Sequence, residues 1–376
     1  MGKRARAPES PSAVCPALQV RRRKLSYGTA CSGIGAPDVA MRRLGVDFEY
    51  KFASEIDEDA RNVLSSHAAD ATVVAANVKG SAGRDTYVDL YVAGFPCVAF
   101  SGCGPMRAFD DSRTDAFFAI SDYINAHEPS VFVLENVKML MTMKRGSCWD
   151  VVLKTLSAVG GGVYHLAWKV ISPHHLGFAQ SRNRLFIVGI HKKNIPQAAV
   201  PEYEFAFPEV CDAQSPNRQR LQDILMSDAE AIQSESDCVR EMPRNAARVL
   251  KIIKRGLAKR NITYSHEVPH MVDAHVSDAR IRHGIEEASL CLTTRCRDFY
   301  LLGRERYITS AEALRIQGFE DKDVPYEMDL KLRKRFQFAG NAMHVDTMAA
   351  LLRPLVAMIQ AAIVVYPGLP DPARRH

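Results

Sequence analysis

The chain has 376 residues, of which 47% are hydrophobic and 24% charged, with nine cysteines and a formal net charge of +6. This length and composition suit a folded globular protein of about two domains and exclude a fibrous or largely unfolded chain. No apolar run follows the first basic residues and no CxxC pair is present, so we expect an intracellular protein with reduced thiols.

The positive charge is concentrated at the N-terminus. Residues 1–24 hold seven Lys and Arg against one Glu, whereas residues 25–376 hold 42 basic and 42 acidic residues. The tail is predicted to be disordered, and its cluster Arg21–Lys24 is typical of a nuclear import signal or a phosphate-binding segment, although a solubilising tail explains it equally well. We therefore expect a nuclear protein if the source is eukaryotic and a cytoplasmic one otherwise.

Short apolar runs alternate with amphipathic stretches over residues 25–190, which is typical of a parallel β-sheet flanked by helices. The predicted strands are Leu25–Ala30, Tyr50–Glu55, Asp89–Phe95, Ser130–Glu135, His165–Ile171 and Arg184–Ile190. The sequence therefore predicts an α/β domain in this part of the chain.

Residues 191–290 show a different pattern, with Pro-, Ser- and Gln-containing connections around one strong helix signal at 243–260. Basic residues recur there at spacings of three or four, which places them on one helix face. They are Arg240, Arg244, Arg248, Lys251, Arg255 and Lys259. Such a stripe suits a phosphate backbone, so Arg244 and Arg248 are candidate substrate-binding residues, but an ordinary solvated face is equally consistent.

Residues 291–376 are predicted to complete the α/β domain. A helix is expected to begin at the capping box formed by Thr309 and Glu312, and residues 338–363 are expected to form the closing helix. The apolar stretch Met348–Tyr366 contains Arg353 and Pro354, which favours a buried helix over a membrane span.

The first predicted strand runs into the turn Ser32-Gly33-Ile34-Gly35. Glycines at such a turn let the backbone approach a ligand, and Glu55, at the end of the next strand, is placed to bind ribose hydroxyls. Asp38 occupies the third glycine position of a dinucleotide fingerprint, which disfavours a pyrophosphate. A nucleoside ligand such as S-adenosylmethionine therefore fits better, although a plain strand-to-helix turn stays possible.

Cys97 follows a proline in "GFPCVAFS", at the end of a predicted strand. A lone cysteine there is more often core packing than a nucleophile. Two further features favour chemistry: Glu135 ends the next strand at the same sheet edge, where sites of parallel sheets form, and alternation directs Arg182 and Arg184 to one side. Arginines so placed can stabilise a thiolate, a carboxylate or a phosphate.

Taken in order, these motifs resemble the cytosine-C5 methyltransferase family. They are "CSGIGAPDVA", "SEID", "GFPCVAFS", "LENV", "QSRNR", "RERYITSAEALRIQGF" and "FAGNAMHVDTM". The resemblance covers about residues 25–190 and 290–352. It implies a Rossmann-like, S-adenosylmethionine-dependent methyltransferase sheet flanked by helices, with residues 191–290 as a small target-recognition domain.

The resemblance also implies an activity: transfer of a methyl group from S-adenosyl-L-methionine to C5 of cytosine in DNA. Cys97 would add to C6, Glu135 would contact N3 and the exocyclic amine, Arg182 would anchor the activated base and Arg184 would support it. A duplex target would have to be flipped out of the stack. No metal site and no membrane partner are expected.

Further residues are carried over from the family's motifs. The cofactor-binding set is Ser32, Gly33, Ile34, Gly35, Glu55, Ile56, Asn77, Pro96 and Asn341. Ser101 and Gln180 join the substrate-binding set. The sequence departs from the family at three positions. Asn77 stands for an aspartate that binds the adenine amine, Val98 follows the cysteine where glutamine is usual, and Thr114 replaces a glycine in "DDSRTDAFF".

Three alternatives remain at this point. A tRNA-methylating branch shares the fold, but its Cys-Phe-Thr tripeptide is absent between 191 and 290. A catalytically silent nucleic-acid-binding relative is opposed by the joint presence of Cys97, Glu135, Arg182 and Arg184. A nicotinamide oxidoreductase is opposed by Asp38 and by the lack of a hydride-transfer constellation.

Overall fold

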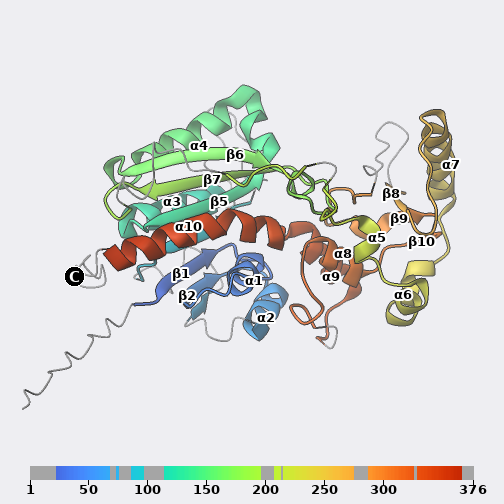
Figure 1. The fold of residues 1–376 in the computed structure, drawn as a ribbon, viewed down its shortest axis with the longest axis horizontal. Helices are drawn as coiled ribbons and strands as arrows, with labels where there is room; N and C mark the ends of the chain where they lie inside the picture. The colour runs from blue at the N-terminus through green and yellow to red at the C-terminus, as the bar shows by residue number, and fades with distance from the viewer. Residues whose placement is uncertain are drawn as a thin grey trace, which may run out of the picture.

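The computed structural model describes residues 23–67, 73–75, 86–96, 114–195, 207–212, 215–274, 287–325 and 328–365. Its larger lobe holds a seven-stranded sheet in the order β3-β2-β1-β4-β5-β7-β6 (Figure 1). The strands are β1 Leu25–Ala30, β2 Phe48–Ser54, β3 Val73–Ala75, β4 Leu90–Gly94, β5 Val131–Val137, β6 Tyr164–Ile171 and β7 Arg184–His191. The predicted α/β class is confirmed, and each predicted strand is present within two residues at either end.

The sheet is parallel from β3 to β5, but β7 pairs antiparallel with both β5 and β6. The sequence pattern did not predict this reversal. Residues 172–183 connect β6 to β7 through one 3-10 turn, Pro173–Leu176, in place of a crossover helix, so β7 returns in the opposite direction. As a result β7 begins where β5 ends, and Arg184 lies opposite Val137.

Helices cover both faces of the sheet because its central strands are apolar on both sides. The helices on one face are α1 Ala36–Arg43, α2 Glu58–His67 and α10 Val345–Val365, and those on the other are α3 Thr114–His127 and α4 Ser147–Ala158. Along β5, Val131 and Val133 pack toward the first set, whereas Phe132 and Leu134 pack toward the second. By the same alternation, Glu135 belongs to the α1 and α10 face.

The predicted closing helix is two helices in the structure, α9 Leu332–Asn341 and α10, with a break at residues 342–344. Pro354 lies inside α10 rather than at the break. Among the described residues, Leu332–Ile363 is long and apolar enough to pass for a membrane span. The apolar side chains of α10 nevertheless lie in the protein core, where α10 packs along α1, as expected from the sequence.

The smaller lobe contains a three-stranded antiparallel sheet in the order β10-β9-β8. Its elements are α5 Leu221–Ile224, α6 Asp228–Ser234, α7 Arg244–Lys259, β8 His270–Asp273, β9 Phe299–Leu302 and β10 Arg306–Tyr307. One sheet face packs against α7, and the other contributes Met271, Phe299 and Leu301 to the core of the larger lobe. Because β8 pairs with β9, this lobe draws on residues either side of the boundary predicted at 290.

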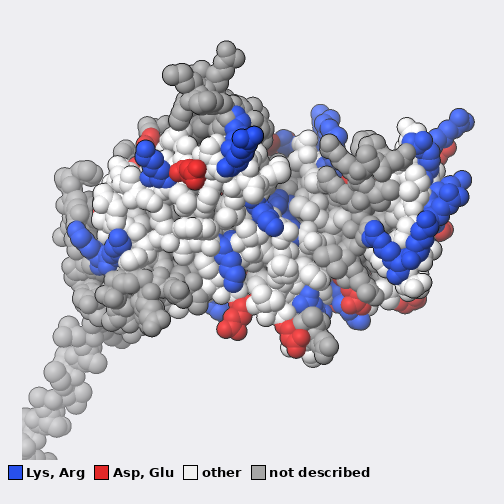
Figure 2. All heavy atoms as spheres, turned by 90° about the horizontal axis from the view of Figure 1, so that it is seen from above, with Lys and Arg blue, Asp and Glu red and all other residues white. Residues whose placement is uncertain are grey.

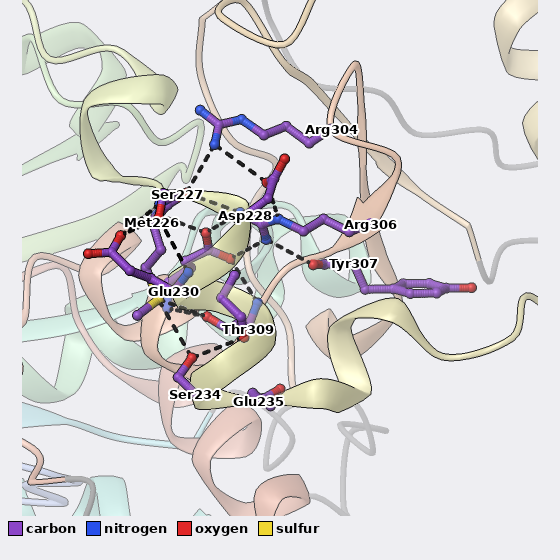
Figure 3. Close-up of polar contacts among 12 residues, drawn as sticks. Met226, Ser227, Asp228, Glu230, Ser234, Glu235, Arg304, Arg306, Tyr307 and Thr309 are labelled. Carbon is purple, nitrogen blue, oxygen red and sulfur yellow. Dashed lines mark hydrogen bonds and ion pairs between the residues drawn. The ribbon is translucent and has the colours of Figure 1, made fainter.

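A buried arginine joins the two lobes. Arg306 Nε donates to Asp228 Oδ1 at 2.7 Å (Figure 3). Its Nη2 donates to Glu312 Oε1 at 2.8 Å. Glu312 also completes the predicted capping box with Thr309 at the start of α8 Ser310–Ile316, which is confirmed. Since α8 belongs to the main core, this network fixes the small sheet to the larger lobe.

Part of the predicted N-terminal basic cluster is paired within the fold. Arg23 Nη1 lies 2.5 Å from Oδ2 of the buried Asp89, and Lys24 Nζ lies 2.7 Å from Asp47 Oδ1. Residues 1–22, including the rest of the cluster, lie outside the described residues.

Candidate active site

The turn after β1 is fastened to β2 and opens toward solvent. The Ser32 amide and hydroxyl both donate to the Ser54 carbonyl, at 2.9 and 3.1 Å, while Ile34 is buried in the core. Gly33 and Gly35 adopt left-handed conformations, with φ of 55° and 80°. A Cβ atom at Gly33 would meet nothing within 4 Å, so the turn presents its backbone to open space.

Glu55 lies directly against this turn. Its Oε2 accepts from the Gly33 amide at 2.7 Å, and its Oε1 accepts from the Asp57 amide at 2.9 Å. The next side chain, Ile56, is 78% exposed, an unusual position for a large aliphatic group. The structure therefore brings together a glycine turn, a carboxylate that retains free lone pairs, and an apolar surface.

This arrangement fits S-adenosylmethionine. The open backbone at Gly33 can approach an amino-acid or ribose group, Glu55 can accept from ribose hydroxyls, and Ile56 can cover an adenine ring. Asp38, whose position in the turn argued against a dinucleotide ligand, is buried at the start of α1 and pairs with Arg42 Nε at 3.2 Å. No described group of three or more His, Cys, Asp or Glu is arranged to hold a metal ion.

A second part of the edge lies between β4 and β5, where Gly94 pairs in register with Glu135. A Cβ atom at Gly94 would lie 2.6 Å from Met343 Cε and 3.7 Å from Glu135 Oε2, so the backbone at Gly94 lies close to the break between α9 and α10. Asn341, the last residue of α9, is exposed beside this break. The C-terminal motif thus reaches the same sheet edge as Glu135.

The predicted nucleophile follows this edge directly. Pro96 is half-buried two residues after Gly94, and Cys97 comes next in the sequence. Cys97, Val98, Ser101 and Asn77 lie outside the described residues, so their predicted roles remain predictions.

Glu135 and Arg184 form an ion pair at the end of β5. Arg184 Nε lies 3.0 Å from Glu135 Oε1, and the two side chains are 16% and 13% exposed. The neighbouring Asn136 is buried and donates to the Phe95 carbonyl at 3.0 Å, which holds the end of β5 against the segment leading to Cys97. A partly buried carboxylate with a fixed guanidinium can bind a polar planar group through charge-assisted hydrogen bonds.

Arg182 is placed differently. It is 2% exposed, and its guanidinium donates to the carbonyls of Leu292, Gly340 and Ala342 at 2.7, 3.0 and 2.9 Å. Burial, together with the nearby charge of Arg184, lowers the Arg182 pKa to about 10, so the group stays charged at neutral pH. Arg182 therefore ties the start of β7 to the break between α9 and α10.

Gln180 is likewise fully buried, and its Nε2 donates to the Ile316 carbonyl at 3.4 Å. The alternation predicted for Gln180, Arg182 and Arg184 is present, because Asn183 between the two arginines is exposed. Only Arg184 of the three reaches Glu135.

Two residues of this region were given no role from the sequence, Cys291 and Gln317, although Gln317 lies in the motif "RERYITSAEALRIQGF". Cys291 Sγ lies 3.7 Å from Arg182 Nη1 and 4.0 Å from Arg184 Nη1. Gln317 Nε2 donates to the Ala342 carbonyl at 3.1 Å, the same oxygen that accepts from Arg182. Both contacts join residues more than twenty positions apart, which a motif cannot reveal.

The predicted substrate-binding residues Arg244 and Arg248 lie on α7 in the smaller lobe and are exposed. Arg240, predicted to share their face, does not. Its guanidinium carbon lies 3.6 Å from the Tyr307 ring centre, and its Nη2 lies 2.9 Å from Asp298 Oδ1. The residue precedes the helix, where helical periodicity no longer applies.

A sheet with a reversed seventh strand, a glycine turn after its first strand and a carboxylate after its second defines an S-adenosylmethionine-dependent methyltransferase. Solved structures agree on the fold. EhMeth from Entamoeba histolytica has a TM-score of 0.59 at 15% identity and covers 89% of this chain and 98% of its own. A putative DNA modification methyltransferase of an E. coli prophage also has a TM-score of 0.59, at 19% identity, with 89% and 99% covered.

The C-5 cytosine-specific DNA methylase family matches residues 29–357, and the chain belongs to it. The type II methyltransferase M.DsaV from Dactylococcopsis salina is 26% identical over 346 residues, covering 90% of this chain and 88% of that protein. M.NgoBI from Neisseria gonorrhoeae is 28% identical over 322 residues, covering 85% and 89%. The resemblance seen in the sequence is confirmed: the chain is a DNA cytosine-5 methyltransferase that uses S-adenosylmethionine.

Proposed function

We propose that the chain methylates C5 of a cytosine turned out of duplex DNA, through a covalent bond between Cys97 Sγ and C6 of the base. The observation that supports this most directly is the Glu135 to Arg184 ion pair, because Glu135 is in register with Gly94, and Gly94 is three residues before Cys97 in the sequence. The turn that fits the methyl donor lies at the same end of the parallel strands, as the transfer requires.

The chemistry assigns each residue a distinct task. The Cys97 thiolate adds to C6, forming the sulfur–carbon bond, while Glu135 hydrogen-bonds N3 and the exocyclic amine and favours electron flow toward C5. Bound S-adenosylmethionine supplies an electrophilic methyl group. After C5 has taken the methyl group, loss of the C5 proton and of the thiolate restores the ring and frees Cys97.

The contacts favour different roles for the two arginines. Arg184 is held beside Glu135 and is the guanidinium placed to contact the base. The Arg182 guanidinium donates to the backbone carbonyls of two segments, one at Leu292 and one at the break between α9 and α10. These contacts support a positioning role rather than the base-anchoring role expected from the motif. Gln180, equally buried, belongs with Arg182.

The donor would be held by the turn residues Ser32, Gly33, Ile34 and Gly35, with Glu55 on the ribose and Ile56 against the adenine. Asn341 and Pro96 complete this set at the adjoining strand end, and Asn77 remains the proposed partner of the adenine amine. The tRNA alternative is less favoured, since the curated relatives named above are type II methyltransferases.

The test is methyl transfer from labelled S-adenosylmethionine to duplex DNA and, separately, to tRNA. We expect label on DNA, none with Cys97→Ala, and a loss of about 100-fold or more with Glu135→Gln, which keeps the shape but removes the carboxylate. A covalent adduct should form on duplex DNA containing 5-fluorocytosine. Label on tRNA alone, or an active protein that forms no adduct, would overturn the proposal.

A further inference from the structure

Helix α7 presents a basic face that takes no part in the active site described above. Its exposed basic residues repeat along the helix, opposite a buried apolar side. The stripe consists of Arg244, Arg248, Lys251, Arg255 and Lys259. At 3.6 residues per turn these five side chains fall within an arc of about 80°, so they form one narrow row.

This row is unfavourable for the helix by itself. Residues Arg244–Lys259 contain no Asp or Glu, and the basic residues stand three or four positions apart, where like charges repel. Arg244 also places a positive charge at the helix N-terminus, against the helix dipole. Phosphate groups along the row would offset the repulsion among Lys251, Arg255 and Lys259.

The overall composition does not explain the row, because residues 25–376 have equal numbers of acidic and basic residues. Figure 2 shows Lys and Arg side chains gathered at the end of the molecule where Figure 1 places α7. The row is about 22 Å long, with a charge every 4.5 to 6 Å or so. A DNA duplex, which carries one charge per roughly 1.7 Å of axis, offers several phosphates over that length.

The base of α7 is fixed, which favours a static contact surface. Val249, Ile253 and Leu257 pack on the small sheet, and Arg240 holds the preceding segment against Tyr307. The row is therefore displayed by a rigid element that the Arg306 network connects to the catalytic lobe.

We propose that the outer face of α7 binds the phosphate backbone of duplex DNA, independently of sequence. The proposal rests on the proposed function in one respect, that duplex DNA is the substrate. Contacts to phosphates add affinity and orientation without reading bases. The row therefore serves to hold and position DNA, and target choice lies elsewhere.

The test is binding, measured by fluorescence anisotropy on a 30-base-pair duplex of A·T pairs, which contains no cytosine. The dissociation constant is compared at 50 and 200 mM salt for the wild type and for Lys251→Gln/Arg255→Gln/Lys259→Gln. Loss of three phosphate contacts should reduce the ratio of the two constants by about 40-fold. The variant Lys251→Arg/Arg255→Lys/Lys259→Arg should keep the wild-type ratio.

A matched control removes three exposed charges elsewhere, with Lys154→Gln/Lys193→Gln/Arg353→Gln on α4, after β7 and on α10. Its ratio should stay within about twofold of the wild type. An unchanged ratio in the folded α7 variant, or an equal change in the control, would overturn the inference. Because no cytosine or methyl donor is present, this outcome is separate from failure of the proposed methylation.

Discussion

Arg182 and the basic row of α7 use positively charged side chains in opposite ways. Arg182 is buried and surrounded by carbonyl oxygens from Leu292, Gly340 and Ala342. The side chains of Lys251, Arg255 and Lys259 on α7 are exposed and stand among like charges. In the sequence, both are basic residues suited to a phosphate or a base. Burial and partners, rather than residue type, separate an internal connection from a surface for a ligand.

Truncation of the two kinds of arginine gives the largest expected contrast. Arg182→Met removes the guanidinium that donates to the buried Leu292 and Gly340 carbonyls, whereas the Ala342 carbonyl keeps Gln317 as a donor. The change should lower the free energy of unfolding by about 3 kcal/mol or more. Arg255→Met on α7 should change it by less than about 0.5 kcal/mol. Urea denaturation measures both. If Arg182→Met were as stable as the wild type yet inactive, Arg182 would have to contact the base.

Acid pH offers a second contrast, through His344 beside Arg182. Burial and the charges of Arg182 and Arg43 lower the His344 pKa to about 3, far below its unfolded value. Below about pH 6.5, His344 therefore binds a proton in the unfolded chain but not in the native state. As a result, the free energy of unfolding falls as the pH drops below about 6.5.

Between pH 8 and pH 5 the titration of His344 should lower the free energy of unfolding by about 2 kcal/mol. His344→Asn removes the titration but keeps an acceptor for the Thr347 amide. In the wild type this amide donates to His344 Nδ1 at 3.2 Å. Unfolding measured at both pH values should show that the variant loses about 2 kcal/mol less than the wild type. Parallel pH curves would mean that the pKa of His344 is the same in the native and the unfolded state.

The smallest expected effect concerns α7 alone. Gly256 lies inside the helix, and a Cβ atom added there would meet nothing within 4 Å. Gly256→Ala should raise the free energy of unfolding by about 0.5 to 1 kcal/mol, because alanine is the better helix former. The affinity for DNA should stay within about twofold of the wild type, because residue 256 lies outside the basic row. A loss of stability would show that this side of α7 is covered.

Local patterns predicted most of the elements. Apolar runs located the strands, the Thr309 and Glu312 pair located the start of α8, and the order of the strands placed Glu135 at the same edge as the glycine turn. These features depend on residues close in sequence or on a general property of parallel sheets.

Features that depend on distant contacts were not predicted. The break between α9 and α10 has no proline to mark it, whereas Pro354 is accommodated inside α10. The Ala342 carbonyl at the break accepts from Arg182 and Gln317, so tertiary hydrogen bonds take the place of helix continuation. In the same way alternation assigned Arg182 to a side of the strand but could not say what packs there.

The packing of α10 along α1 has a consequence for synthesis of the protein. The two helices cover the same face of the first strands, but about 300 residues separate them. At roughly 5 to 20 residues per second, α1 leaves the ribosome some 15 to 60 s before α10. The apolar surface of β1 and α1 must wait that long for its cover, so the nascent chain is expected to depend on chaperones until translation ends.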